Sequence, residues 1–399
     1  MDSVELARFL TAMTLAVHII FATIGVGMPV MFAVAEFIGI KKNNPLYTTL
    51  AKRWSKGYTI TVAVGVVTGT IIGLQLSLLW PTFMQMGGHV IALPLFMETF
   101  AFFFEAIFLS IYLYTWDRFK GKWTHFLIRS FHVVATALMT MAFVLAAIAA
   151  FKLLKNKFKK DTEYHKKALK LTMILGVVFT LGSMLAGDLS AKFLHQEQPE
   201  KLAAYEWHFD TESHADLVLF GSLDEKTQEV NGAIKIPGLL SFLADNNTNT
   251  EVKGLDEFPK DLQPPMIVHY YFDLMVSMGV FCLVVSGAYV LTLIFKKLRK
   301  FTHSKPMLYG ALLTGPAAML AIEFGWFLTE QGRQPWIVRG YLKVADAATQ
   351  AGGLTLVTIL FGLLYLVLMV TSAYVLIRMF KEKPAYKEVE ALASERGDA

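Results

Sequence analysis

LTAMTLAVHIIFATIGVGMPVMFAVAEFIGI, residues 10–40, is an almost wholly apolar stretch with His18 inside it. It is long enough to cross a bilayer, because a transmembrane helix needs about 20 mostly apolar residues. Seven later stretches have the same character: 58–80, 91–115, 127–154, 169–187, 268–296, 307–329 and 352–379. Backbone groups in lipid must be hydrogen-bonded within the chain, so all eight are predicted to be helices. The predicted fold class is an all-α, polytopic transmembrane helix bundle.

The composition agrees with a membrane protein. Of 399 residues, 55% are hydrophobic and only 17% are charged, a balance unlike that of soluble domains. The single cysteine, Cys282, excludes a disulfide framework and a CxxC site for a metal or c-type haem. The net charge of +5 does not indicate a nucleic-acid partner, because the basic residues cluster beside the apolar stretches.

Lysine and arginine in short loops predict the orientation, since they favour the cytoplasmic side. The loop after residues 10–40 is basic, whereas residues 81–90 carry no charge. This pattern predicts an N-terminus outside the cell. The C-terminal end is predicted to be cytoplasmic, because it carries Arg378, Lys381 and Lys383.

The alternation fails at residues 127–154. Arg118, Lys120 and Lys122 precede this stretch, and the segment at its other end, 152–170, carries eight lysines. One helix cannot have both ends on the same side. We therefore expect nine crossings, with one missing between Leu127 and Arg129, and a break in the chain among residues 126–130.

Residues 188–266 form the only long hydrophilic segment, with fifteen acidic and six basic residues. By the same counting it lies outside the cell. Its apolar patches, 217–223 and 234–243, predict a partly folded surface unit. The chain is thus expected to divide into helices at 1–187, this loop at 188–266, helices at 267–380 and a cytoplasmic tail at 381–399.

Ionisable residues inside the apolar stretches are the main functional signal. Each costs roughly 2.5–3.5 kcal/mol to insert at membrane depth, so such residues usually pair, bind a cofactor or carry protons. They are His18, Glu98, Glu105, His132, Glu323 and Glu330. A protein that retains them is expected to move protons, electrons or ions.

Several of these residue types suit haem. Imidazole is a common axial ligand of haem iron, and a His/Met pair is typical of cytochromes, so His18, His132 and Met275 are candidates. The alternatives are a histidine bonded to a backbone carbonyl and a methionine that only fills the core. Glu98 and Glu105 are two turns apart on one helix face, which favours a proton relay over simple hydrogen bonding between helices.

The most specific string is EFGWFLTEQGRQPW, residues 323–336. Gly332 and Pro335 should end the helix, and Arg333 suits a carboxylate or propionate, which its planar fork binds at two points. The alternative is an ordinary interfacial belt of Trp and Arg.

This string closely resembles the hallmark of subunit I of cytochrome bd-type quinol oxidases. The resemblance covers nearly the whole chain, through LTAMTLAVHIIF (10–21), SFHVV (130–134), GDLSAKF (187–193), KLAAYE (201–206) and FDLMVSMG (272–279). The polar loop is short, as in the shorter-loop branch of the family. The family's fourth helix is missing before IRSFH, in agreement with the charge argument.

The resemblance implies three haems. His132 and Met275 correspond to the ligands of a low-spin haem b. His18 and Glu330 correspond to the ligands of two high-spin haems, one a haem b and the other haem d or a third haem b. The family places Trp326 between haems and Arg333 near their propionates. Asp273 is a departure, because some relatives have arginine two residues before the methionine.

The resemblance also implies the remaining site residues and the partners. Glu98 and Glu105 correspond to proton-delivery acids, and Lys201 and Glu206 to the quinol-oxidising pair. The expected partners are membrane quinol, O2, a second integral-membrane subunit and a small single-span subunit, in a bacterial plasma membrane.

The implied function is a terminal oxidase. Quinol is oxidised at the outer face, and O2 is reduced to water with cytoplasmic protons, so a proton-motive force arises without a pump. Two alternatives use the same buried residues. A proton-coupled transporter should show repeats and broken helices, which are not evident, and an electron-relay cytochrome b should supply two His pairs.

Overall fold

The computed structural model describes residues 2–87, 125–155, 159–338, 340–382 and 384–395. In this part of the chain, seven helices are long and apolar enough to cross a membrane. They are α1 (Ser3–Lys41), α2 (Pro45–Leu79), α4 (His125–Lys155), α5 (Thr162–Glu197), α8 (Val268–Ile294), α9 (Lys305–Gly332) and α11 (Leu354–Glu382). The predicted helical class is therefore confirmed. The expected span 91–115, with Glu98 and Glu105, lies outside the described residues.

Local sequence explains where the first two helices begin. Asp2 and Glu5 form a capping box at the start of α1, in which each side chain accepts a hydrogen bond from the other's backbone N–H. Asn44 caps α2, and Pro45 occupies its first turn, where its missing N–H is not needed. A short turn therefore joins the two antiparallel helices.

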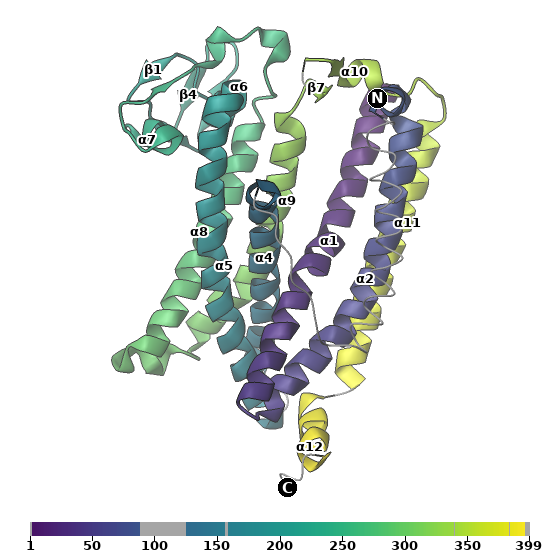
Figure 1. The fold of residues 1–399 in the computed structure, drawn as a ribbon, viewed down its shortest axis with the longest axis vertical. Helices are drawn as coiled ribbons and strands as arrows, with labels where there is room; N and C mark the ends of the chain where they lie inside the picture. The colour runs from purple at the N-terminus through teal and green to yellow at the C-terminus, as the bar shows by residue number, and fades with distance from the viewer. Residues whose placement is uncertain (1, 88–124, 156–158, 339, 383, 396–399) are drawn as a thin grey trace.

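Helix α4 lies at the centre of the bundle and packs against its neighbours through glycines. A Cβ on Gly27 of α1 would lie 2.4 Å from the Met141 side chain. On Gly315 of α9 it would lie 2.6 Å from Ala147. Small residues let membrane helices approach closely, so these positions fix the spacing of α1, α4 and α9. In Figure 1, α1, α2 and α11 lie beside one another, and α1 meets the other helices at the end of the bundle that carries α12.

The break expected among residues 126–130 is not present. The backbone runs as one helix from His125 to Lys155, so this prediction was wrong. Residues on both sides of Leu127 belong to a single run compatible with helix, and the chain continues through it without interruption.

The polar segment forms a small folded unit at one end of the bundle, above α5 and α8 (Figure 1). Helix α5 continues past residue 187 to Glu197, and α6 (Pro199–Tyr205) follows it directly. Three antiparallel ribbons pair β1 (Glu212–Ser213) with β6 (Glu251–Val252), β2 (Leu217–Leu219) with β5 (Ile234–Ile236), and β3 (Ser222–Asp224) with β4 (Glu229–Asn231).

The unit has its own small core, as expected from its apolar patches. Leu202, Leu217, Leu240 and Val252 are buried together, and α7 (Leu239–Asp245) supplies one side. The 3-10 turns η2 (Leu255–Glu257) and η3 (Lys260–Leu262) lead the chain back to α8. The segment after α9 lies at the same end, with β7 (Trp336–Val338), β8 (Leu342–Lys343) and α10 (Val344–Ala347).

The opposite end of the bundle carries the basic turns and the C-terminal helix α12 (Ala385–Glu395). Arg53 lies 2.9 Å from Glu388 of α12. The backbone N–H of Tyr386 donates to Asp161 of η1 (Lys159–Asp161) over 2.7 Å. The 3-10 helix η4 (Lys296–Phe301) joins α8 to α9 at this end. The predicted cytoplasmic charges thus gather at one end, although which side of the membrane it faces stays a prediction.

Candidate functional site

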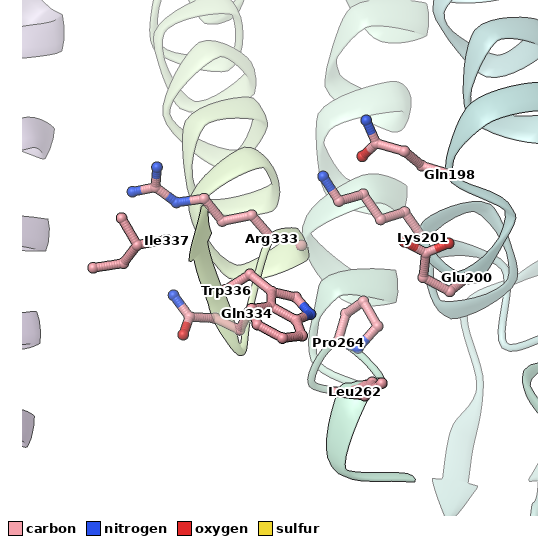
Figure 2. A pocket seen from close by; sticks show the side chains of 10 residues that line it. Gln198, Glu200, Lys201, Leu262, Pro264, Arg333, Gln334, Trp336 and Ile337 are labelled. Atoms are coloured by element: carbon pink, nitrogen blue, oxygen red, sulfur yellow. The ribbon is translucent and has the colours of Figure 1, made fainter. Parts of the chain in front are cut away.

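Two motifs that are far apart in sequence meet at a cavity of about 230 Å³ at the polar-unit end. Figure 2 shows Gln198 and Lys201 on one side, and Arg333, Gln334 and Trp336 on the other. Pro264 lies between them, just before α8. The cavity therefore joins KLAAYE to GRQPW.

Short regular elements hold the cavity walls. Pro199 is in the first turn of α6, which carries Lys201. On the other side, α9 ends at Gly332, and Trp336 begins β7 opposite Lys343 of β8. The Lys343 ammonium lies 5.6 Å from the centre of the Trp336 ring, within the range of a cation–π contact.

Glu330 and Arg333 form an ion pair at the end of α9. Their side chains are 26% and 42% exposed, so both can exchange partners. Trp326 is half-buried on the same helix, one turn before Glu330. The structure therefore brings together three residues that were predicted to serve haem.

Tyr205 and Glu206 lie just behind the cavity. Tyr205 packs so closely on Gly332 that a Cβ there would lie 2.3 Å from the tyrosine hydroxyl oxygen. Glu206 is only 2% exposed. Its Oε2 atom is buried with no hydrogen-bond partner among the described residues. Lys201 lines the cavity and Glu206 does not, so the structure does not place the expected quinol pair on one cavity wall.

The environment of Glu206 disfavours its charged form. Burial and the nearby Asp273 carboxylate raise the pKa of Glu206 well above its usual value. Such a carboxyl group keeps its proton to higher pH than a solvated one.

His269 and Asp273 form a buried pair that sequence reasoning did not identify as a site. The His269 Nδ1 atom lies 2.7 Å from the carbonyl oxygen of Tyr205, which can only accept, so Nδ1 carries a hydrogen. The His269 Nε2 atom lies 3.3 Å from Asp273 Oδ2. The two side chains are therefore in contact, although Nε2 has no hydrogen-bond partner among the described residues.

Two neighbours hold this pair in place. The Trp207 ring stacks on His269, with ring centres 4.0 Å apart, and the backbone N–H of Phe220 donates to Asp273. The spacing of four residues in HYYFD was the available signal, because it puts both side chains on one helix face.

His132 and Met275 have contacts on different helices. The His132 Nδ1 atom lies 3.2 Å from the Ser183 carbonyl oxygen on α5. The Met275 sulfur lies against Gly325 of α9, where a Cβ would be 3.1 Å away. The structure does not itself bring the two together. With Nδ1 occupied, however, His132 keeps Nε2 for a metal, as ligating histidines usually do.

His18 has a similar arrangement on α1. Its Nδ1 atom lies 2.9 Å from Thr68 Oγ1 on α2. The Thr68 hydroxyl donates to the carbonyls of Val64 and Gly65 in its own helix, so it accepts from His18. This hydrogen bond leaves Nε2 with its lone pair, which fits a haem ligand.

Comparison with known proteins identifies the family. The family model for cytochrome bd terminal oxidase subunit I matches residues 6–130 and 124–384. The chain belongs to this family. A solved structure of bd oxidase from Geobacillus thermodenitrificans is 49% identical, with a TM-score of 0.88, covering 96% of this chain and 99% of that chain.

Two named relatives come from Bacillus subtilis (strain 168). A putative cytochrome bd menaquinol oxidase subunit I is 37% identical, over 99% of this chain and 100% of the relative. A cytochrome bd ubiquinol oxidase subunit 1 is 31% identical, over 96% of this chain and 94% of the relative. Cytochrome bd membership decides for a terminal oxidase over the transporter and electron-relay alternatives.

The cytochrome bd comparisons also bear on the missing crossing. The family model matches in two parts that meet at residues 124–130. The alignment with the first relative extends over 446 residues, longer than this chain of 399. Part of the relative therefore has no counterpart here, which supports the prediction of a missing segment.

Proposed function

We propose that this chain oxidises membrane quinol at the cavity joining Lys201 to GRQPW and carries the haems that receive the electrons. Family membership makes it a subunit of a quinol:O2 oxidoreductase that acts with a second subunit and uses haem and quinol. The cavity is the observation that carries the proposal, because it unites two family motifs at one end of the membrane bundle.

The cavity residues suit a quinol head group. The Lys201 ammonium would hold a quinol oxygen, and the Trp336 indole would cover the ring. Tyr205, the residue before Glu206, packs against the cavity residue Gly332. The protons leaving quinol would pass to Glu206 as the general base. A carboxyl group with a raised pKa binds a proton more tightly than a solvated one.

The Nδ1 contacts of His18 and His132 support their roles as haem ligands. His132 and Met275 would hold the low-spin haem b, while His18 and Glu330 would hold the two high-spin haems, one of them haem d or a third haem b. Bound haem supplies one-electron transfer and O2 reduction. Arg333 would leave its ion pair with Glu330 and bind a haem propionate instead. Trp326 would lie between haems.

Proton handling and orientation complete the proposal. Glu98 and Glu105 would deliver protons from the cytoplasm, while quinol protons leave at the outer face, so charge is separated without a pump. The polar unit and N-terminus would lie outside a bacterial plasma membrane and the C-terminus inside. A second integral-membrane subunit and a small single-span subunit would complete the enzyme.

Replacing Glu206 tests the proposal. Glu206→Gln should depress quinol-driven O2 consumption and spare O2 consumption driven by an artificial haem reductant. Glu212→Gln, an exposed acid of the same unit, is the matched control and should leave both activities unchanged. Equal loss in both assays for Glu206→Gln would refute the assignment.

A further inference from the structure

A second cavity lies at the opposite end of the bundle, far from the quinol cavity. Its volume is about 160 Å³. The amino-terminal turns of α5, the last turns of α8 and the turn before α9 line it. Because three membrane-spanning helices begin or end here, the cavity lies at the level of the membrane–water boundary.

The lining is strongly basic. Lys166, Lys167 and Lys170 come from α5 and His303 from the turn before α9. Glu163 also lines the cavity, and Lys166 pairs with it over 2.9 Å. Lys167 and Lys170 form no ion pair in the described part of the chain. The positive end of the α5 dipole adds to this field.

The wall of the cavity also holds a buried tyrosine hydroxyl. Tyr289 lines the cavity and is fully buried. Its hydroxyl has no hydrogen-bond partner in the described part of the chain. Buried hydroxyls are nearly always satisfied, so an oxygen atom of a ligand is the natural partner.

We infer that this cavity binds the phosphate group of an anionic phospholipid. Two lysines supply charge, and the Tyr289 hydroxyl donates a hydrogen bond. Cavities for drug-sized ligands run from roughly 300 to 1,000 Å³, so this one suits a single phosphate. Leu291 and Ile294, 47% and 62% exposed on the last turns of α8, offer an apolar surface for the acyl chains. Basic pockets between helices commonly bind such head groups.

The environment of His303 supports the inference. Burial and the charge of Lys166 lower the pKa of His303. The position thus disfavours a further positive charge. Glu163 offsets only part of the positive charge of the lining, and a bound phosphate would supply further negative charge.

The test measures lipid binding by the purified, delipidated oxidase complex. The probes are phosphatidylglycerol, phosphatidylcholine and inorganic phosphate, and the readouts are lipid retained per complex and thermal midpoint. Phosphatidylglycerol should bind and raise the midpoint, whereas phosphatidylcholine, whose choline offsets the phosphate charge, should not. If inorganic phosphate alone reproduces the shift, the same site takes a soluble phosphate.

Matched variants locate the site. Each lysine replaced should weaken phosphatidylglycerol binding about fivefold, so Lys167→Gln with Lys170→Gln should weaken it about 25-fold. Tyr289→Phe should also weaken binding while leaving the ligand-free midpoint unchanged or higher. Lys296→Gln with Lys297→Gln removes the same charge from exposed η4 and should weaken binding less. Equal weakening by both lysine pairs, or none by Tyr289→Phe, overturns the inference.

Discussion

His18 Nδ1 lies 2.9 Å from Thr68 Oγ1, so one helix orients the imidazole of another. Thr68→Val keeps the shape and removes the acceptor. We expect it to weaken retention of one high-spin haem by about 10- to 100-fold, the usual effect of losing a partner of a ligating histidine. Haem content after detergent washing measures this effect.

Controls separate orientation of His18 from general damage. Thr70→Val removes an exposed hydroxyl that bonds only within α2 and should retain haem, and Thr68→Ser should recover most of the loss. His18→Ala should lose the haem and all O2 consumption. If turnover persists in His18→Ala, His18 is only a core residue.

His132→Ala tests the low-spin site. The variant should lose the low-spin band of the reduced spectrum and keep the high-spin haems, because its contact with Ser183 lies on a different helix pair from that of His18. Optical difference spectra of the purified complex measure both signals. A low-spin band that survives would remove His132 from the ligand set.

The pH dependence of stability should show the burial of Glu206. Its pKa is raised in the folded protein, so the unfolded chain loses this proton first as pH rises. The stability that protonated Glu206 contributes is fully present below the pKa of this group in the unfolded chain. It falls by about 1.4 kcal/mol per pH unit between that pKa and the higher pKa in the folded protein. Glu206→Gln should therefore gain in thermal midpoint over the wild type as pH rises from 5 to 8. A constant difference would contradict the burial of this carboxyl.

Gly332→Ala should disturb the quinol cavity. Its Cβ would lie 2.3 Å from the Tyr205 hydroxyl oxygen, so Tyr205 must shift, at a cost of about 1–3 kcal/mol. We expect a higher KM for quinol. Gly279→Ala, where a Cβ meets nothing within 4 Å in the interior of α8, should leave KM unchanged and should not lower stability. Tyr205→Phe should partly relieve the Gly332→Ala defect.

The mass of the intact subunit tests the prediction of a missing membrane crossing. The 399 residues have a mass of 44.6 kDa. We expect the intact subunit from its native membrane to be heavier by one helix and its loop, with at least about 20 added residues. Peptides joining residues 123 and 130 without interruption, at a mass of 44.6 kDa, would show that the charges were misinterpreted.

Sequence predicted the helices well, because a long apolar run such as residues 10–40 has one stable form in lipid. It also singled out His18 and Glu330, since ionisable residues are conspicuous in such runs, and their roles as haem ligands stay predictions. It could not predict that Tyr205 lies on Gly332 or that Thr68 faces His18, because these contacts depend on how helices pack. The break near Leu127 was wrongly expected, since loop charges report topology and not whether a helix can continue.

The ribbons of the polar unit are all two-stranded, and the register of each is only two or three residues long. Isolated ribbons of this kind are marginal in water. Asp273, on membrane helix α8, accepts the N–H of Phe220 that follows β2, and His269 binds the end of α6. The unit is therefore a poor candidate for grafting or for expression as a water-soluble antigen. An antibody raised against the excised segment would recognise conformations that the segment does not adopt in the whole membrane protein.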